Sequence, residues 1–140
     1  MKILLPVDGS DHTKRMLAYL AAHDELLGRV NETVVFTAVP PVPMHAARFV
    51  ERHVLDDYVR EQADAVLQPV RAFLEQQHVT ARFEHACGHA ADAIAAIAAA
   101  ERPDLIVMGT HGQGAVANVF LGSVATGVLA RCKLPLLLVP

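Results

Sequence analysis

The sequence predicts an α/β protein in which helices cover both faces of a parallel β-sheet. Short apolar runs alternate with longer segments of helical periodicity, an order typical of parallel sheets with crossover helices. The apolar runs are nearly continuous, as expected for strands that are buried on both faces. The chain has 140 residues, of which 53% are apolar, so it can build one sizeable core. We therefore expect a single domain spanning residues 1–140.

Apolar runs and periodic segments predict strands and helices in the order β-α-β-α-β-α-β-α-β. The predicted strands cover residues 2–7, 33–39, 79–86, 105–108 and 135–139. The predicted helices cover, to within a few residues at each end, 11–27, 46–77, 90–100 and 120–131.

The first two strands are each followed by a clear stop signal. Residues 8–11 form a turn signal, in which Ser10 or Asp11 is suited to cap the first helix. Gly28 marks the end of that helix. The second strand is β-branched and apolar, and the prolines within residues 40–43 exclude regular structure directly after it.

The later elements are predicted from periodicity. Pro69 lies inside the long second helix and should kink or split it, because an interior proline costs about 3 kcal/mol. The third strand alternates, with Val79, Ala81 and Phe83 on one face. An alanine-rich segment around Ile94 predicts a buried third helix, and the last strand–helix–strand unit surrounds a glycine-rich loop.

The residues from 108 to 124 contain the strongest functional signal. Gly109, Gly112 and Gly114 follow a predicted strand, and a glycine–serine pair lies at the start of the last predicted helix. Unpaired N–H groups and the helix dipole make a helix start an anion site, and glycines let the backbone approach a ligand closely. The alternative is a loop that only connects the strand to the helix, but such a loop does not require three glycines in six positions. The pattern favours a phosphate-binding site.

Composition argues against several classes of function. The formal net charge is −3, and the chain has no basic run, so nucleic acid is not an expected partner. Its apolar stretches are much shorter than the roughly 20 residues of a membrane helix, and its start does not resemble a signal peptide. Cys87 and Cys132 suggest free thiols in a reducing compartment, and we expect the protein in the cytoplasm.

The loop motif resembles that of a known family. Gly109, two residues, Gly112, nine residues and then Gly122-Ser123 match the signature of nucleotide-binding universal stress proteins. The resemblance extends over nearly the whole chain, through residues 3–10, 35–39, 103–109, 122–125 and 134–139. It implies a flavodoxin-like or Rossmann-like doubly wound sheet of five parallel strands in the order 3-2-1-4-5. It also implies that ATP, or ADP or AMP, lies above the first and fourth strands.

The resemblance assigns roles by position. The nucleoside would be lined by Pro6, Val7 and Asp8, with the Asp8 carboxylate near the ribose or base. The backbone of Val39 would meet the adenine. The ribose and phosphates would be wrapped by Gly109, His111, Gly112, Gln113, Gly114 and Ala115, and Met108 would also belong to the nucleotide site. The outer phosphates would be held by Gly122, Ser123 and Val124, with Mg²⁺ or Mn²⁺ accompanying the phosphates.

Three departures from the family pattern bear on function. Many members have histidine where this chain has Ala38, and Gly114 is an additional glycine. The loop also lacks Lys and Arg, whereas fast phosphoryl transfer needs cationic clamps. We therefore expect a nucleotide-gated stress sensor that acts through an unknown protein partner, with no catalytic residues. A slow ATPase and a dimeric scaffold with a vestigial loop remain the alternatives.

Two further features are open to interpretation. His85, Cys87 and His89 could approach one metal ion, but no fourth ligand is evident, so we favour solvated histidines and no protein-held metal. Residues 135–139 form an apolar strand at an open sheet edge in the implied order, and bare edges tend to pair. The family pairs this strand across a two-fold axis, which implies a homodimer.

Overall fold

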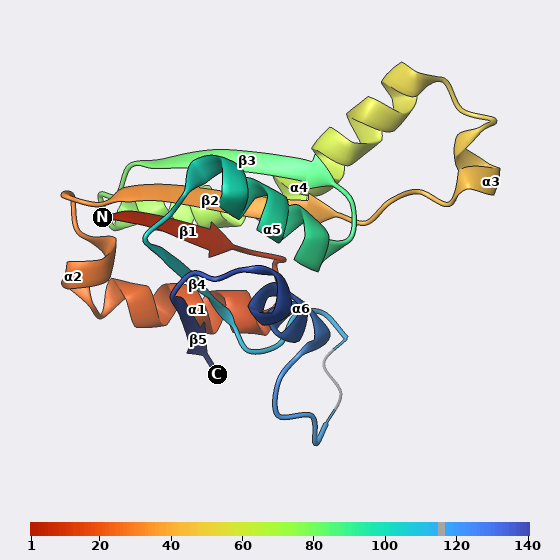
Figure 1. Ribbon diagram of the computed structural model, residues 1–140. Helices are drawn as coiled ribbons and strands as arrows, with labels where there is room; N and C mark the ends of the chain where they lie inside the picture. The colour runs from red at the N-terminus through yellow and green to blue at the C-terminus, as the bar shows by residue number, and fades with distance from the viewer. Residues whose placement is uncertain (115–116) are drawn as a thin grey trace.

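The computed structural model describes residues 1–114 and 117–140 and contains one parallel sheet (Figure 1). Its strands are β1 (Lys2–Pro6), β2 (Glu32–Val39), β3 (Ala81–Cys87), β4 (Leu105–Gly109) and β5 (Leu136–Val139). They lie in the order β3-β2-β1-β4-β5, which confirms the predicted fold class and strand order. The helices are α1 (Asp11–Ala21), α2 (Asp24–Leu27), α3 (Met44–Ala47), α4 (Arg52–Gln76), α5 (Ala90–Glu101) and α6 (Ser123–Arg131).

Two apolar layers form the core, one on each face of the sheet. Alternate residues of a strand point to opposite faces, so Val35 of β2 packs with α1 and α4, whereas Phe36 packs with α5 and α6. Both side chains are almost completely buried. At the second face Gly127 lets α6 approach α5 closely, because a Cβ there would lie 2.6 Å from that of Ala91.

The first predicted helix is capped as expected but ends early. The hydroxyl of Ser10 accepts a hydrogen bond from the N–H of Thr13 at 3.4 Å. The helix then stops at Ala21 and a short α2 follows, so the prediction of one continuous helix was wrong. At the break, the His23 Nδ1 lies 2.7 Å from the carbonyl oxygen of Tyr19, a terminal carbonyl of α1.

Two other predicted helices start later than expected. The long helix was predicted from residue 46, but a separate α3 precedes α4, and Pro69 does not split α4. Ala65, whose carbonyl loses its partner at Pro69, is exposed, so water can hydrate it. The last helix begins at Ser123 because Gly122 is extended, and Phe120 is left outside it with 96% of its surface exposed.

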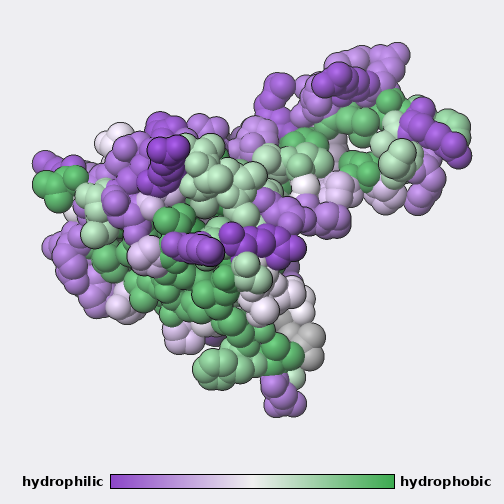
Figure 2. Space-filling model, viewed as in Figure 1, coloured by the Kyte–Doolittle hydropathy of each residue, from purple (hydrophilic) through white to green (hydrophobic). Residues whose placement is uncertain are grey.

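The segment from residue 40 to the middle of α4 projects away from the sheet (Figure 1). We call residues 40–60 the arm. Apolar side chains are exposed on it, with Phe49 81% and Met44 88% accessible, and they form green patches in Figure 2. Within the described residues, no helix combines the length and apolar character that a membrane span requires.

Candidate functional site

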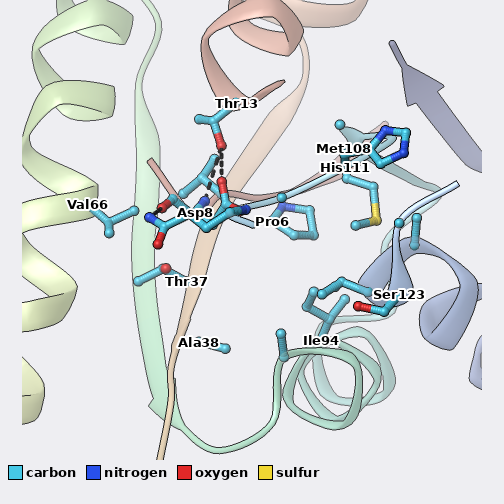
Figure 3. Close-up of a pocket in the computed structure, with 18 of the residues that line it drawn as sticks. Pro6, Asp8, Thr13, Thr37, Ala38, Val66, Ile94, Met108, His111 and Ser123 are labelled. Atoms are coloured by element: carbon cyan, nitrogen blue, oxygen red, sulfur yellow. Dashed lines mark hydrogen bonds between the residues drawn. The ribbon is translucent and has the colours of Figure 1, made fainter. Parts of the chain in front are cut away.

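A cavity of about 580 Å³ opens at the carboxyl ends of β1, β2 and β4 (Figure 3). The strand order reverses beside β1, because the chain continues to β2 on one side and β4 lies on the other. In doubly wound sheets, ligands bind outside the carboxyl ends of the strands at such a switch point. The volume also lies within the range of about 300–1,000 Å³ that is usual for small-molecule sites.

The cavity extends over both faces of the sheet. Thr37 and Val66 line it from the α4 side, whereas Ile94, Met108 and Ser123 line the opposite side (Figure 3). The walls between these groups are largely apolar. The site therefore offers surface for a flat ring together with polar groups at its margins.

Asp8 fastens the turn after β1 to the glycine-rich loop. Its Oδ1 accepts hydrogen bonds from the Ser10 N–H at 3.0 Å and the Thr13 hydroxyl at 2.9 Å. Its Oδ2 accepts from the Gln113 N–H at 2.9 Å, and the Gln113 amide donates to the Asp8 carbonyl at 2.8 Å. Burial alone would raise the pKa of this carboxyl, but the hydrogen bonds from Ser10, Thr13 and Gln113 outweigh it and lower the pKa. Asp8 is therefore a carboxylate at neutral pH.

Close approach explains why the loop needs its glycines. A Cβ on Gly112 would lie 2.5 Å from the Asp8 Oδ2, and one on Gly109 would lie 2.8 Å from the His12 Cβ. A Cβ on Gly122 would lie 2.9 Å from the Thr110 carbonyl oxygen. At Gly114 the reason is conformational instead, because its φ of 75° is strained for other residues.

The ring of His111 holds the loop together. Its Nε2 lies 2.6 Å from the carbonyl oxygen of Val119, which can only accept, so Nε2 is the protonated nitrogen. Its Nδ1 lies 3.1 Å from the Thr110 hydroxyl, and its ring centroid lies 5.2 Å from that of His12. The His111 donor is therefore used inside the loop.

The amino-terminal end of α6 borders the cavity. The Gly122 N–H donates to the Thr110 carbonyl at 2.7 Å, and the first hydrogen bond within the helix runs from the Thr126 N–H to the Gly122 carbonyl at 3.0 Å. The N–H groups of Ser123 and Val124 precede that bond, and both residues line the cavity. Ser123 also directs its hydroxyl toward the cavity (Figure 3). This end of α6 is a suitable anion site.

The structure brings the predicted site residues together around one cavity. The lining includes Pro6, Val7, Asp8, Val39, Met108, Gly109, His111, Gly112, Gln113, Gly114, Gly122, Ser123 and Val124. Ala115 lies outside the described residues. The lining residues that sequence reasoning missed include Thr13, Thr37, Gln62, Val66, Ala90 and Ile94. Those on α4 and α5 had no local signal beyond helical periodicity, because only tertiary packing brings them to the site.

The described lining contains no lysine or arginine, and its ionisable side chains are Asp8 and His111. Across the described residues, no group of three or more His, Cys, Asp or Glu side chains is arranged to hold a metal ion. Asp8 is engaged by three donors, so the residues present do not form a site for Mg²⁺ or Mn²⁺. The arrangement is suited to binding an organic anion through backbone N–H groups.

Solved structures share this fold over nearly the whole chain. Protein MJ0577 matches with a TM-score of 0.81 at 25% identity, covering 99% of this chain and 94% of that one. A universal stress protein in complex with cAMP matches with a TM-score of 0.72 at 20% identity, covering 100% and 97%. An Arabidopsis thaliana family member with AMP bound matches with a TM-score of 0.71 at 13% identity, covering 99% and 90%.

Sequence comparison confirms the resemblance that the loop motif suggested. The profile of the Universal stress protein family matches residues 1–140. A Thermus aquaticus protein described as "Universal stress protein in QAH/OAS sulfhydrylase 3'region" is 37% identical over 137 residues, covering 98% of this chain and 96% of that protein. Universal stress protein MJ0531 of Methanocaldococcus jannaschii is 30% identical over 139 residues, covering 99% and 81%. The chain belongs to the universal stress protein family.

Proposed function

We propose that the chain binds an adenine nucleotide in the cavity at the carboxyl edge of its sheet. The observation that carries the proposal is the position of this cavity of about 580 Å³ between the glycine-rich loop and the amino-terminal end of α6. Apolar walls suit a base, and helix N–H groups suit a phosphate. The AMP and cAMP complexes of the structural neighbours support the same ligand class. ATP, ADP, AMP and cyclic AMP are the candidates.

In the proposed orientation the base lies over the end of β2 and the phosphate lies at α6. Pro6 and Ala38 line the cavity where the base would lie, and the backbone of Val39 would meet its edge. Ser123 and Val124 would donate their N–H groups to a phosphate. Mg²⁺ or Mn²⁺ would be held by the phosphates and water of a bound nucleotide, since no group of three or more His, Cys, Asp or Glu side chains among the described residues is arranged to hold a metal ion.

We further propose that the nucleotide regulates a protein contact during stress. Pro40 lines the cavity and begins the arm, so a ligand at the end of β2 would lie beside the segment that leads to α3. The exposed apolar residues of the arm, such as Phe49, suit a contact with another protein. We place this function in the cytoplasm, because the free cysteines Cys87 and Cys132 suit a reducing compartment.

We also propose a homodimer formed through β5. This strand lies at the end of the sheet order, and Leu136, Leu137 and Leu138 are only partly buried. An uncovered apolar edge strand favours pairing with another chain. Sedimentation at micromolar concentration should give the mass of two chains, and a monomer would contradict this part of the proposal.

Calorimetry on nucleotide-free protein tests the main proposal. Adenine nucleotides should bind with a stoichiometry of one per chain, and guanine nucleotides serve as the matched control for the base. Absence of heat with every adenine nucleotide, with and without Mg²⁺, would refute the proposal. Phosphate release well above background that is lost in Asp8→Ala, without loss of binding, would favour the slow ATPase instead.

A cellular test separates the nucleotide-gated switch from a scaffold with a vestigial loop. Gly122→Glu places bulk beside the Thr110 carbonyl and negative charge at the phosphate end of the cavity. The variant should lose stress tolerance if the nucleotide gates function. Unchanged tolerance, with normal amounts of folded protein, would favour the scaffold.

A further inference from the structure

We infer that the cavity selects adenosine monophosphate over ADP and ATP. The inference rests on the proposed nucleotide function and concerns how much negative charge the site can hold. Three observations carry it: the charge of the lining, the hydrogen bonds already made within the loop, and the limited positive charge that the start of α6 supplies to an anion.

The described part of the lining provides no lysine or arginine side chain for additional phosphates. Its described residues include neither lysine nor arginine, and the Asp8 carboxylate adds a negative charge. A phosphate monoester already carries about −1.5 to −2 charges at neutral pH. Each further phosphate would bring more negative charge against a largely apolar wall, where an uncompensated charge is costly.

The polar side chains of the loop are engaged with the protein itself. The Gln113 amide donates to the Asp8 carbonyl at 2.8 Å, and the His111 Nε2 donates to the Val119 carbonyl at 2.6 Å. The Thr110 hydroxyl lies 3.1 Å from the His111 Nδ1. The Gln113 backbone N–H is also occupied, by the Asp8 Oδ2 at 2.9 Å. A triphosphate would have to break these contacts to use the same donors.

The start of α6 borders the cavity and suits one phosphate group. The N–H groups of Ser123 and Val124 and the Ser123 hydroxyl lie at the cavity, whereas the Gly122 N–H is occupied by the Thr110 carbonyl. A helix start supplies the equivalent of about half a positive charge within its first turn. That charge stabilises a phosphate group in contact with the helix start. The stabilisation is weaker for the more distant phosphates of ADP or ATP.

Calorimetric titration of the nucleotide-free protein with AMP, ADP and ATP in the absence of divalent metal tests the inference. AMP should bind at least about 10-fold more tightly than ATP, with ADP between them. Added Mg²⁺ should narrow the difference, because it neutralises part of the triphosphate charge. ATP binding as tightly as AMP without metal would overturn the inference and leave the nucleotide function intact. Absence of binding by all three would overturn both.

A pair of variants at Gln113 tests the physical cause. Gln113→Lys adds a cation at an exposed position of the lining, while the backbone N–H that binds Asp8 stays in place. It should raise ATP affinity relative to AMP at least about 5-fold. Gln113→Met removes the same side-chain hydrogen bond without adding charge, and it should leave the AMP-to-ATP ratio unchanged. If the lysine variant leaves that ratio unchanged as well, charge is not the cause.

Discussion

Charged side chains are distributed differently at the two edges of the sheet where its strands begin and end. At the amino-terminal edge, where β1 begins and α5 ends, the Lys2 Nζ and an Arg82 nitrogen each lie 2.6 Å from a carboxylate oxygen of Glu101. The same Arg82 nitrogen lies 3.1 Å from Glu32 on β2. At the carboxyl-terminal edge the described lining of the cavity has no cationic side chain. Cations are thus used for joining strands at one edge, and backbone N–H groups are available for ligand at the other.

The largest expected effect comes from placing negative charge at the cavity edge. Ser123→Asp should weaken AMP binding at least about 100-fold, because like charges 4 Å apart repel by about 4 kcal/mol at an effective dielectric constant of 20. The same change should leave the free energy of unfolding unchanged or raise it by about 0.3–1 kcal/mol, since an acidic residue in a first turn favours the helix. Calorimetry and urea denaturation measure the two effects.

Gln77→Glu is the matched control for that prediction. It adds the same charge at the C-terminal end of α4, outside the cavity. AMP affinity should stay within about 2-fold of the wild type. Equal weakening in both variants would show that net charge, and not the position at α6, governs binding.

An intermediate effect is expected from Asp8→Asn. Hydrogen bonds to a charged group contribute about 1.5–3 kcal/mol, and the amide cannot accept at both positions that Ser10, Thr13 and Gln113 address. The free energy of unfolding at neutral pH should fall by about 2 kcal/mol in urea denaturation. Asp11→Asn, at the exposed start of α1, is the control and should change it by less than about 0.5 kcal/mol.

The pH dependence of that difference sharpens the test. The folded-state pKa of Asp8 lies below its ordinary value of 3.8. The stabilisation of the folded state by the Asp8 carboxylate is therefore fully present above the pKa of the unfolded chain. It is lost as the pH falls through the lower pKa of the folded state. The gap in stability between wild type and Asp8→Asn should be constant near neutral pH and close in acid. A gap that persisted in acid would show that shape, not charge, is responsible.

The smallest effect is expected at the opposite edge. Hydrogen bonds from Arg82 and then Lys2 lower the pKa of Glu101 to about 2. The contribution of the Glu101 carboxylate to stability is fully present above its ordinary pKa of 4.5. It is lost as the pH falls through the folded-state pKa of about 2. Glu101→Gln should lower the urea midpoint slightly at neutral pH, less so in 1 M salt because salt screens exposed pairs. AMP affinity should not change, and a change would mean that the two edges are coupled.

Sequence reasoning predicted the layers and the glycine-rich side of the cavity because both leave local signals. Continuous apolar runs identified the strands, and the family motif supplied their order. The early end of α1 was missed because hydrophobic periodicity does not reveal local contacts such as that between the His23 ring and the Tyr19 carbonyl. The α4 side of the cavity was missed because Gln62 and Val66 reach it only through tertiary packing.

The role of Asp8 shows a different kind of limit. Its position after the first strand indicated importance, and the resemblance suggested a contact with ribose or base. In the structure both carboxylate oxygens accept hydrogen bonds from protein donors, one of them 105 positions away. Such a contact between distant segments cannot be read from spacing, because nothing near Asp8 in the sequence specifies which later N–H group will reach it.

That long-range contact has a consequence for synthesis. Gln113, which reaches Asp8, follows the fourth strand in the chain, and α6 follows later still. A nascent chain that ends before α6 lacks Ser123 and Val124, so it has no complete site. Nucleotide binding would therefore stabilise only full-length molecules, so a truncated translation product gains no protection from the ligand and stays open to proteolysis.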